Sequence, residues 1–339
     1  MESRQFYTRK DKVVLWCGYA LLGLFSLAVL IPLIYVVLAS FIDPVVLTNQ
    51  GISFLPEDWT LEGYRRVFQD DMIGRGFLNS FLYSTTFAVF STIICLLAAY
   101  PLSLPQFVGR KAINTFFLIT MFFGGGLMPT YLLVSNLNLI NSPLALILPG
   151  AVNVWNIILA RTYYKSIPLE LHEAAALDGA SELQYFFRIL IPVCKPIIAV
   201  LVLYQFVGMW NSYFDAMIYL EDQSLQPLQL VIRSILVQNT PRPGMVADAQ
   251  NAAMMAKIAE QLKYSTIVVS SLPLLVMYPF FQKYFEKGVM LGSVKGYNSD
   301  RRLRRKQGGI LGAAVEECKR RPKARRTIRA PQEGKLSAI

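Results

Sequence analysis

The sequence predicts an all-α membrane protein with six transmembrane helices, and three observations lead to that fold class. Of the 339 residues, 54% are hydrophobic and only 16% are charged, whereas a soluble domain usually carries about 25% charged residues. The apolar residues gather in five runs that contain no Asp, Glu, Lys or Arg. Each run reaches the roughly 18 residues that a helix needs to cross the hydrocarbon core, and lipid offers the backbone no other hydrogen-bond partner.

The six predicted spans follow from these runs in chain order. The run at 112–160 is long enough for two crossings, and a polar stretch at 135–143 with three asparagines and a proline marks a turn between them. The first run is too long for the apolar core of a signal peptide, so we expect it to remain as an anchor. The predicted spans are 13–41, 77–100, 112–134, 144–161, 196–219 and 264–283.

The distribution of charge predicts how the spans are oriented. Lys and Arg are enriched in loops on the cytoplasmic side of a membrane. With both termini inside, the inner segments hold ten Lys and Arg residues against seven in the much longer outer loops. The prediction is therefore a multi-pass membrane protein with both termini in the cytoplasm.

Three regions are predicted along the chain. Residues 1–12 form a cytoplasmic arm, and residues 13–296 form the membrane domain. The tail at 297–339 carries 13 Lys and Arg against four Asp and Glu, a composition typical of disorder. A basic tail can also bind anionic lipid or nucleic acid, so a scaffold protein led by this tail is one alternative, although we expect no nucleic-acid partner.

The loop at 166–192, between the fourth and fifth spans, has the pattern of two short helices joined by a bend. Pro168 suits a helix start, because its missing N–H costs nothing in the first turn, and Gly179 suits a helix end. Ser181 followed by Gln184 has the form of a capping box for a second helix. Small side chains leave the first helix open to close approach by another protein. Apolar contacts are expected from Leu177, Phe186 and Phe187, and the only histidine, His172, is expected on the surface.

This loop resembles the signature loop of the permeases of binding-protein-dependent ABC importers, which reads Glu-Ala-Ala, three residues, Gly, nine residues, and Ile-x-(Leu or Ile)-Pro. By that resemblance the loop is a coupling helix that docks on a separate ATPase subunit and carries its closure to the spans. Residues 8–296 look closest to the second permease subunit of maltose- and oligosaccharide-type carbohydrate importers, and 123–129 resembles permeases for polysaccharide fragments. The residues assigned to this coupling are Glu173, Ala174, Ala175, Asp178, Gly179, Ala180, Ile189 and Pro192.

The resemblance also implies a location in the bacterial plasma membrane, the partners of the chain and its energy source. The partners are a second permease subunit, two ATPase subunits, an extracytoplasmic sugar-binding lipoprotein and the lipid bilayer. The chain has no Gly-x-x-x-x-Gly-Lys-(Ser or Thr) motif to hold ATP phosphates, so ATP and Mg²⁺ are expected on the ATPase subunits. With one histidine and no paired cysteines, neither a catalytic set nor a metal or cofactor site is predicted, and the chain is not expected to be an enzyme.

Polar residues in the fourth and fifth spans are the candidates for a substrate path. Amides and carboxylates bind sugar hydroxyls, aromatic rings cover sugar C–H faces, and polar groups at membrane depth commonly line a path. The alternative is that these residues hold helices together or form an interfacial belt. The triple glycine before Pro129 is expected to open or kink span three. The path candidates are Trp210, Asn211, Tyr213 and Asp215 near the outer end of span five, and Asn153 and Asn156 in span four.

A stand-alone secondary transporter or channel is the alternative function. Such a protein usually needs a titratable residue at mid-membrane, but no Asp, Glu, Lys or Arg lies well inside a predicted span. The sequence therefore favours a permease subunit that is driven by another chain.

Overall fold

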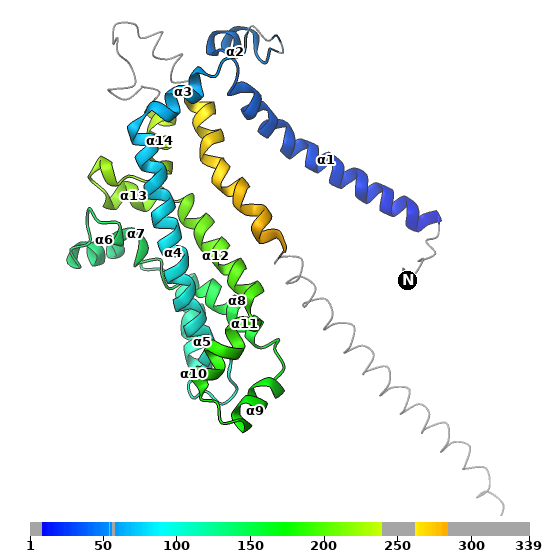
Figure 1. Cartoon of the computed structure of the whole chain (residues 1–339), viewed down its shortest axis with the longest axis vertical. Helices are drawn as coiled ribbons and strands as arrows, with labels where there is room; N and C mark the ends of the chain where they lie inside the picture. The colour runs from blue at the N-terminus through cyan, green and yellow to red at the C-terminus, as the bar shows by residue number, and fades with distance from the viewer. Residues whose placement is uncertain (1–8, 54, 56–57, 239–261, 284–339) are drawn as a thin grey trace, which may run out of the picture. The chain divides into compact units, whose positions relative to one another are not determined.

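The computed structural model describes residues 9–53, 55, 58–238 and 262–283, and all of them belong to one unit of the chain, Met1–Tyr284. Within these residues the chain is helical apart from its turns and one isolated bridge between Ile42 and Trp59, so the predicted all-α class is confirmed (Figure 1). The predicted tail at 297–339 and residues 1–8 of the predicted arm lie outside the described residues.

Short turns separate most of the helices, and side-chain caps explain several of their boundaries. The Asp70 carboxylate, for example, accepts hydrogen bonds from the N–H groups of Met72 and Ile73 at 2.7 and 3.0 Å, which starts the longest helix of the described chain. The elements are α1 (Arg9–Ala39), α2 (Pro44–Gln50), α3 (Glu62–Gln69), α4 (Asp71–Ser103), α5 (Arg110–Phe122), α6 (Leu127–Asn136), α7 (Leu144–Ile147), α8 (Val154–Tyr164), α9 (Glu170–Leu177), α10 (Glu182–Gln184), η2 (Tyr185–Leu190), α11 (Ile191–Val193), α12 (Lys195–Trp210), α13 (Phe214–Tyr219), η3 (Gln223–Leu225), α14 (Leu228–Gln238) and the unlabelled helix Leu262–Lys283.

Three helices are long and apolar enough to cross a membrane unbroken: most of α1, α4 and the helix Leu262–Lys283. They correspond to the first, second and sixth predicted spans. The other apolar segments are bent or divided. If each of two bent pairs counts as one span, up to five spans result from length and composition.

The third predicted span, 112–134, is bent sharply at its glycines. The axis of the chain bends by 109° between α5 and α6. Gly126 lies between these helices, and its φ of +86° is a conformation that favours glycine. The expected kink in span three is therefore confirmed, and the segment is not one straight helix.

The fourth predicted span, 144–161, is wrong as a continuous helix. It consists of the four-residue α7 and the later α8, with residues 148–153 between them. Pro149 and Gly150 disfavour a helix at this point. The Asn153 side chain then accepts the Asn156 N–H at 3.0 Å and begins α8 as its N-cap.

The fifth predicted span, 196–219, is also interrupted. Helix α12 ends at Trp210, and α13 begins at Phe214 after three intervening residues. At the other end of α12, the axis turns by 80° from the segment Glu182–Val193. That segment contains the π-helical turn η2, a feature that disturbs the regular helical ladder.

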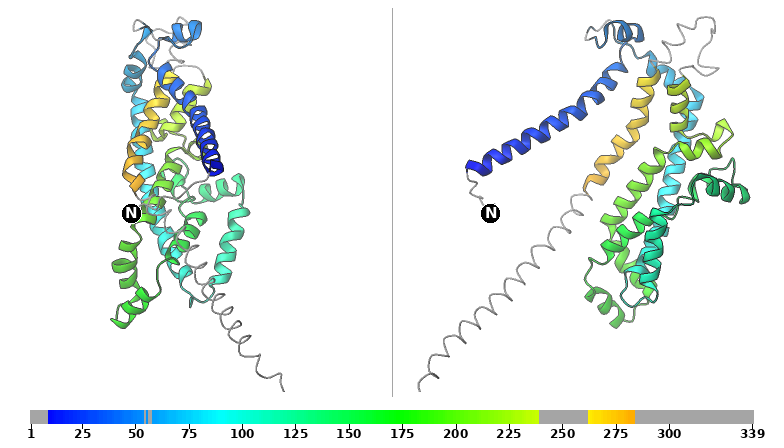
Figure 2. Two further views of the ribbon diagram at one scale, coloured as in Figure 1. Left: turned by 90° about the vertical axis from the view of Figure 1, so that its right-hand side faces the viewer. Right: turned by 180° about the vertical axis from the view of Figure 1, so that it is seen from behind.

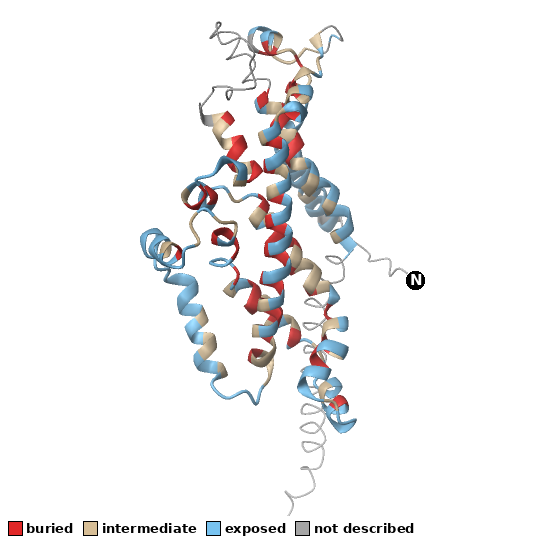
Figure 3. Cartoon of the chain, turned by 60° about the vertical axis from the view of Figure 1, so that its left-hand side comes forward, coloured by how far each residue is buried: buried red, intermediate tan, exposed pale blue. Residues whose placement is uncertain are grey.

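Helix α4 is the centre of the packing. It contacts α12, α8 and α14 along its length, with α9 and α10 near one end and α3 and α14 near the other (Figures 1 and 2). The close approach of α14 depends on Gly76, because a Cβ there would lie 3.1–3.3 Å from atoms of Val231 and Leu228. Buried residues thus run along the length of α4, which connects the helices packed near its two ends (Figure 3).

Helices α1 and α5 contrast with this packed centre. No residue in the most apolar window of α1 is buried, and α5 has no buried residue at all (Figure 3). The end of α1 contacts the rest of the described chain through the Tyr35 ring, which lies 6.3 Å from that of Tyr264, and through Ala39, which packs with Ile42 and Leu47. Apolar surface of this extent is stable where lipid or another apolar protein surface covers it.

Candidate functional site

The segment Glu170–Gln184 forms a bent connection, which we call the elbow, of two short helices, α9 and α10. Helix α9 ends in the left-handed conformation at Gly179, with a φ of +77°. The Gly179 N–H donates to Ala176 O and the Ala180 N–H donates to Ala175 O, both at 3.0 Å. These two bonds form a Schellman motif, which satisfies the last carbonyls of the helix. The predicted helix stop at Gly179 is confirmed.

The predicted capping box at the start of α10 is also confirmed. The Gln184 N–H donates to Ser181 Oγ at 3.3 Å, and the Ser181 N–H donates to Gln184 Oε1 at 2.9 Å. The side chains thus hold the first turn of α10 on one side of the bend while the Schellman motif holds the last turn of α9 on the other. Both sides of the bend are fixed by local hydrogen bonds.

The predicted coupling residues divide into an outer and an inner group. Ala175 is only 6% exposed and lies in a buried cluster with Phe186 and Leu190, against which Ala180 and Ile189 also pack. These three residues therefore hold the elbow on its own core. The outer, exposed group consists of Glu173, Ala174, Asp178, Gly179 and Pro192.

The apolar contacts expected of the elbow need one correction. Leu177 is 89% exposed and Phe187 is 58% exposed, as a docking surface requires, but Phe186 is 3% exposed and belongs to the core. The sequence reading missed Leu183, which is 69% exposed. Ser181 caps the helix that carries Leu183, but this position does not indicate which side chains are exposed, since Tyr185 and Phe186 just after it are buried.

A polar bridge ties the elbow to the end of α4. The Tyr100 hydroxyl of α4 donates a hydrogen bond to the Glu182 carboxylate of α10, and His172 Nε2 of α9 lies 3.2 Å from both oxygens of the same carboxylate. The expected surface position of His172 is wrong, because its side chain is 16% exposed and its ring edge packs on Tyr185. The bond from Tyr100, followed by the contact with His172, holds the pKa of Glu182 below its ordinary value, although partial desolvation opposes this.

The bridge rests on aromatic rings. Tyr100 packs against the rings of Tyr164, Tyr185 and Phe186, with centroids 6.5, 6.3 and 5.0 Å away. Side chains in such a cluster have few alternative rotamers, so the elbow and the end of α4 are expected to move as one piece. From the elbow the chain passes through η2 and α11 directly into α12.

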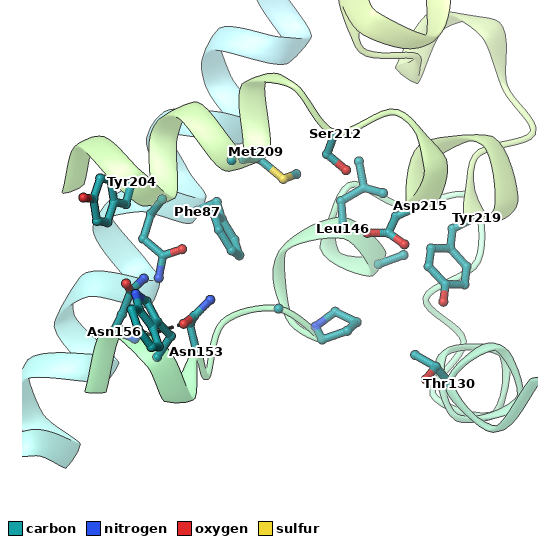
Figure 4. Close-up of a pocket in the computed structure, with 16 residues that line it drawn as sticks. Phe87, Thr130, Leu146, Asn153, Asn156, Tyr204, Met209, Ser212, Asp215 and Tyr219 are labelled. Carbon is teal, nitrogen blue, oxygen red and sulfur yellow. Dashed lines mark hydrogen bonds between the residues drawn. The ribbon is translucent and has the colours of Figure 1, made fainter. Parts of the chain in front are cut away.

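Helix α12 leads from the elbow to a cavity of about 560 Å³ between α12, α8, α7 and α13 (Figure 4). That volume lies within the 300–1,000 Å³ typical of small-molecule sites. Two carboxamides from α8 and its cap, Asn156 and Asn153, and the ring of Tyr204 lie at one end. Asp215, Tyr219 and Thr130 lie at the other end (Figure 4). The lining thus offers hydrogen-bonding groups and aromatic faces together.

A buried polar network supports one wall of this cavity. Gln205 of α12 donates through Nε2 to Ser91 Oγ of α4 at 2.5 Å, and Ser91 Oγ donates to Ala151 O at 2.6 Å. Cys95 of α4 donates through Sγ to Asn153 O at 3.6 Å. Since residues 151 and 153 precede α8, these bonds fix the loop that carries Asn153 into the cavity.

Replacing Ser91 by alanine is expected to destabilise the protein by about 1–3 kcal/mol, because the Gln205 amide and the Ala151 carbonyl would lose a partner in a buried place. Ser84 offers a matched control on the same helix. It is equally buried, but its hydroxyl has no hydrogen-bond partner in the described chain, so Ser84→Ala is expected to be neutral or slightly stabilising. Thermal unfolding of both variants in detergent checks this, and equal shifts would contradict the network.

The structure places the predicted path residues in three different settings. Asn153, Asn156 and Asp215 line the cavity. Trp210 does not reach it, since the side chain is fully buried, donates to Ser270 O at 3.2 Å and packs on Phe77 and Phe206.

The remaining two predicted path residues also lie away from the cavity lining. The Asn211 amide bonds back to Val207 O at 2.9 Å and closes the end of α12. Tyr213 lies under the Arg233 guanidinium, whose carbon is 5.4 Å from the ring centroid. Neither residue is brought into contact with the cavity, and their expected role in a path has no support from their positions.

Sequence reasoning missed several lining residues on α12 and after it. Tyr204, Gln205, Gly208, Met209 and Ser212 all line the cavity. Their spacing of three and four residues marks one face of a helix, and a glutamine inside an apolar run was the signal that could have identified this face.

The described residues contain no group of three or more His, Cys, Asp or Glu side chains arranged to hold a metal ion. Three cysteines fall in this part of the chain, and all are free thiols: Cys17, Cys95 and Cys194. The chemistry that the geometry offers is binding through hydroxyl, amide and aromatic groups.

Comparison with known proteins gives matches over most of the chain. Residues 2–291 match the family model described as "Binding-protein-dependent transport system inner membrane component". The polygalacturonan/rhamnogalacturonan transport system permease protein YtcP of Bacillus subtilis (strain 168) is 36% identical over 279 residues, which cover 82% of this chain and 96% of that protein. Protein LplC of the same organism is 35% identical over 294 residues, covering 85% of this chain and 97% of that protein.

A solved structure is similar over the same extent. A chain in the crystal structure of a bacterial ABC transporter involved in the import of the acidic polysaccharide alginate has a TM-score of 0.75 and 32% sequence identity. The similarity covers 83% of this chain and 99% of that chain. The arrangement of helices described above is thus one that occurs in a transporter of known structure.

Proposed function

The chain belongs to the family of binding-protein-dependent transport system inner membrane components, and from that premise we propose that it forms half of the membrane pathway of an ATP-driven oligosaccharide importer. Two of the similar proteins are named for polysaccharide transport. A cavity lined by carboxamides and aromatic rings supports a saccharide as cargo, because amides bind sugar hydroxyls and rings cover sugar C–H faces. The importer works in the inner membrane of a bacterium.

The elbow carries the proposal that a separate ATPase drives this chain. The exposed Leu177 and Leu183 of the elbow, with Phe187 of the following η2, offer apolar side chains in a segment that also exposes the charged Glu173 and Asp178. Apolar side chains that are rimmed by polar ones mark protein contact sites. A small-residue helix with such a rim supports docking of the ATPase on α9, with the bend at Gly179 fixed by its own hydrogen bonds.

Six crossings with the elbow on the cytoplasmic side fit this proposal. The α5–α6 and α7–α8 segments would be broken crossings, which membrane proteins tolerate where irregular backbone lines a cavity. At the elbow end of α4, Arg110 donates to Leu104 O at 3.2 Å and Arg161 donates to Leu102 O at 3.0 Å. Cations at this end agree with the enrichment of Lys and Arg on the cytoplasmic side.

The mechanism follows the continuous connection from the elbow to the cavity. Closure of the ATPase subunits around ATP and Mg²⁺ would move α9, and the Tyr100–Glu182–His172 bridge would pass that movement to α4. Helix α12 would turn with η2 and α11, and its residues Tyr204, Gln205 and Met209 would reshape the cavity. An extracytoplasmic sugar-binding lipoprotein would deliver the saccharide, and a second permease subunit would supply the other half of the path. The chain itself is proposed to hold no cofactor and to hydrolyse no ATP.

Photocrosslinking from the elbow tests the docking. A photoreactive amino acid in place of Leu177 is expected to capture an ATP-hydrolysing subunit in native membranes. The control is the same replacement at Leu61, which is 65% exposed next to α3 at the opposite end of α4. Capture of the ATPase from position 61, or failure to capture it from position 177 in an assembled complex, would overturn the docking proposal.

Reconstitution tests the transport function. The complex in proteoliposomes is expected to hydrolyse ATP faster when an oligosaccharide-loaded binding protein is added, and to accumulate that oligosaccharide. Transport by this chain alone, without an ATPase, would instead support a stand-alone secondary transporter and would contradict the proposal.

A further inference from the structure

The charge of the cavity lining is unusual for a path that serves acidic polysaccharides. Among the residues that the structure describes, sixteen line the cavity, and none of these sixteen is Lys, Arg or His. One of these described lining residues, Asp215, carries a charge, and it is negative. The similar proteins named for polygalacturonan and for alginate handle chains that carry a carboxylate on their uronate units, for which this lining provides no cation.

The Asp215 carboxylate is also uncompensated by its neighbours. In the described chain it makes no hydrogen bond and no ion pair with another side chain. Arg233, which belongs to the neighbouring α14, is directed elsewhere: its guanidinium lies over the Tyr213 ring and its Nη1 is 3.2 Å from Met217 Sδ. The negative charge is therefore free to act on whatever enters this end of the cavity.

The remaining lining suits an uncharged saccharide. Trp155 and Tyr204 are 59% and 48% exposed and can stack on the C–H faces of sugar rings. Asn153 and Asn156 add carboxamides at the same end (Figure 4). A carboxylate such as Asp215 binds sugar hydroxyls as a hydrogen-bond acceptor, but it repels a second carboxylate placed within several ångströms.

We propose that the half of the path built by this chain selects uncharged saccharides, and that Asp215 is the residue that disfavours uronates. This inference rests on the proposed role of the cavity as the saccharide path. The predicted cargo of this chain therefore differs from the acidic polysaccharides for which two similar proteins are named. At a separation of about 5 Å and an intermediate dielectric, the repulsion is large enough to weaken uronate binding at least about tenfold, or about 1.4 kcal/mol.

A pair of matched ligands tests the proposal. Trigalacturonate and the 4-linked galactotriose made from it by carboxyl reduction have the same length and linkage and differ in charge. Their binding is measured on the complete transporter, purified through this chain and embedded in nanodiscs without the binding protein. The variants are Asp215→Asn and, as a control, Glu221→Gln, which removes an exposed negative charge six residues away and outside the cavity lining.

The expected result is that the unmodified transporter binds galactotriose at least about tenfold more tightly than trigalacturonate. Asp215→Asn is expected to bring the ratio to within about twofold, and Glu221→Gln to leave it unchanged. Equal binding of both ligands to the unmodified transporter, or an unchanged ratio in Asp215→Asn, would overturn the inference and leave the importer function standing. Binding of neither ligand, together with no ATPase stimulation by any saccharide-loaded binding protein, would overturn both.

Discussion

Valine in place of Gly179 is expected to lower saccharide-stimulated ATP hydrolysis and transport at least about tenfold, without preventing insertion into the membrane. The backbone of Gly179 has a φ of +77°, a conformation that costs a residue with a Cβ about 1–2 kcal/mol and a β-branched residue more. No atom lies within 4 Å of the position a Cβ would take, so the effect comes from the backbone. Relief of that strain would unwind the Schellman motif and change the angle at which α9 meets the ATPase.

Gly51 provides a matched control for this prediction. It has a φ of +79°, ends the short helix α2, and has equally open space around it. Its ψ of −147° is, with a positive φ, essentially restricted to glycine, so Gly51→Val introduces at least as much backbone strain, far from the elbow. Coupled ATPase activity that falls equally in both variants would show that strain alone, and not the elbow, explains the loss. ATPase assays on both reconstituted complexes decide between these results.

The elbow could be predicted from the sequence because its structure is determined locally. The left-handed stop at Gly179 and the capping box of Ser181 and Gln184 each depend on groups three to five residues apart. Side-chain and backbone preferences at such short range are strong enough to decide the conformation. The family resemblance then assigned a role to a structure that the residue types already indicated.

The membrane segments were predicted less well, because hydropathy measures composition and not continuity. The run at 144–161 is predominantly apolar, yet Asn153 begins α8 within it and leaves α7 as a separate turn. Length and composition alone cannot distinguish one crossing helix from two half-helices around an irregular loop. Each interrupted segment contributes residues to the cavity lining, as expected if irregular backbone at membrane depth lines a path.

The direction of side chains was the main obstacle to predicting the cavity. Trp210 and Tyr204 are both aromatic residues of α12, but Trp210 is fully buried while Tyr204 is 48% exposed. Which face of an apolar helix is buried depends on its neighbours, here α4 on one side. A run of apolar residues carries almost no information about these contacts. The polar residues Asn156 and Asp215 could be identified because each is an exception within an apolar predicted span.

Removing the Tyr100 hydroxyl is expected to impair coupling by about three- to tenfold, because a hydrogen bond to a charged group is stronger than a neutral one. Tyr100→Phe keeps the ring in its aromatic cluster but leaves Glu182 with only His172 as a partner. Tyr164→Phe is the matched control: Tyr164 packs against Tyr100, and its buried hydroxyl has no hydrogen-bond partner in the described chain. Its removal is expected to leave transport unchanged and to be neutral or stabilising.

A double-mutant cycle shows whether Tyr100 acts through Glu182. Tyr100→Phe and Glu182→Gln are expected to be non-additive, with the double variant no worse than the poorer single variant. Because the pKa of Glu182 is lowered in the folded chain, the contribution of its carboxylate is fully present above its ordinary value of 4.5 and is lost as the pH falls through the lowered value. The bridge is thus intact over the neutral range in which transport is assayed, and the cycle reports the mechanical link between the elbow and α4. Additive losses would mean that the two residues act separately, and that the movement of the ATPase reaches the cavity through α12 alone.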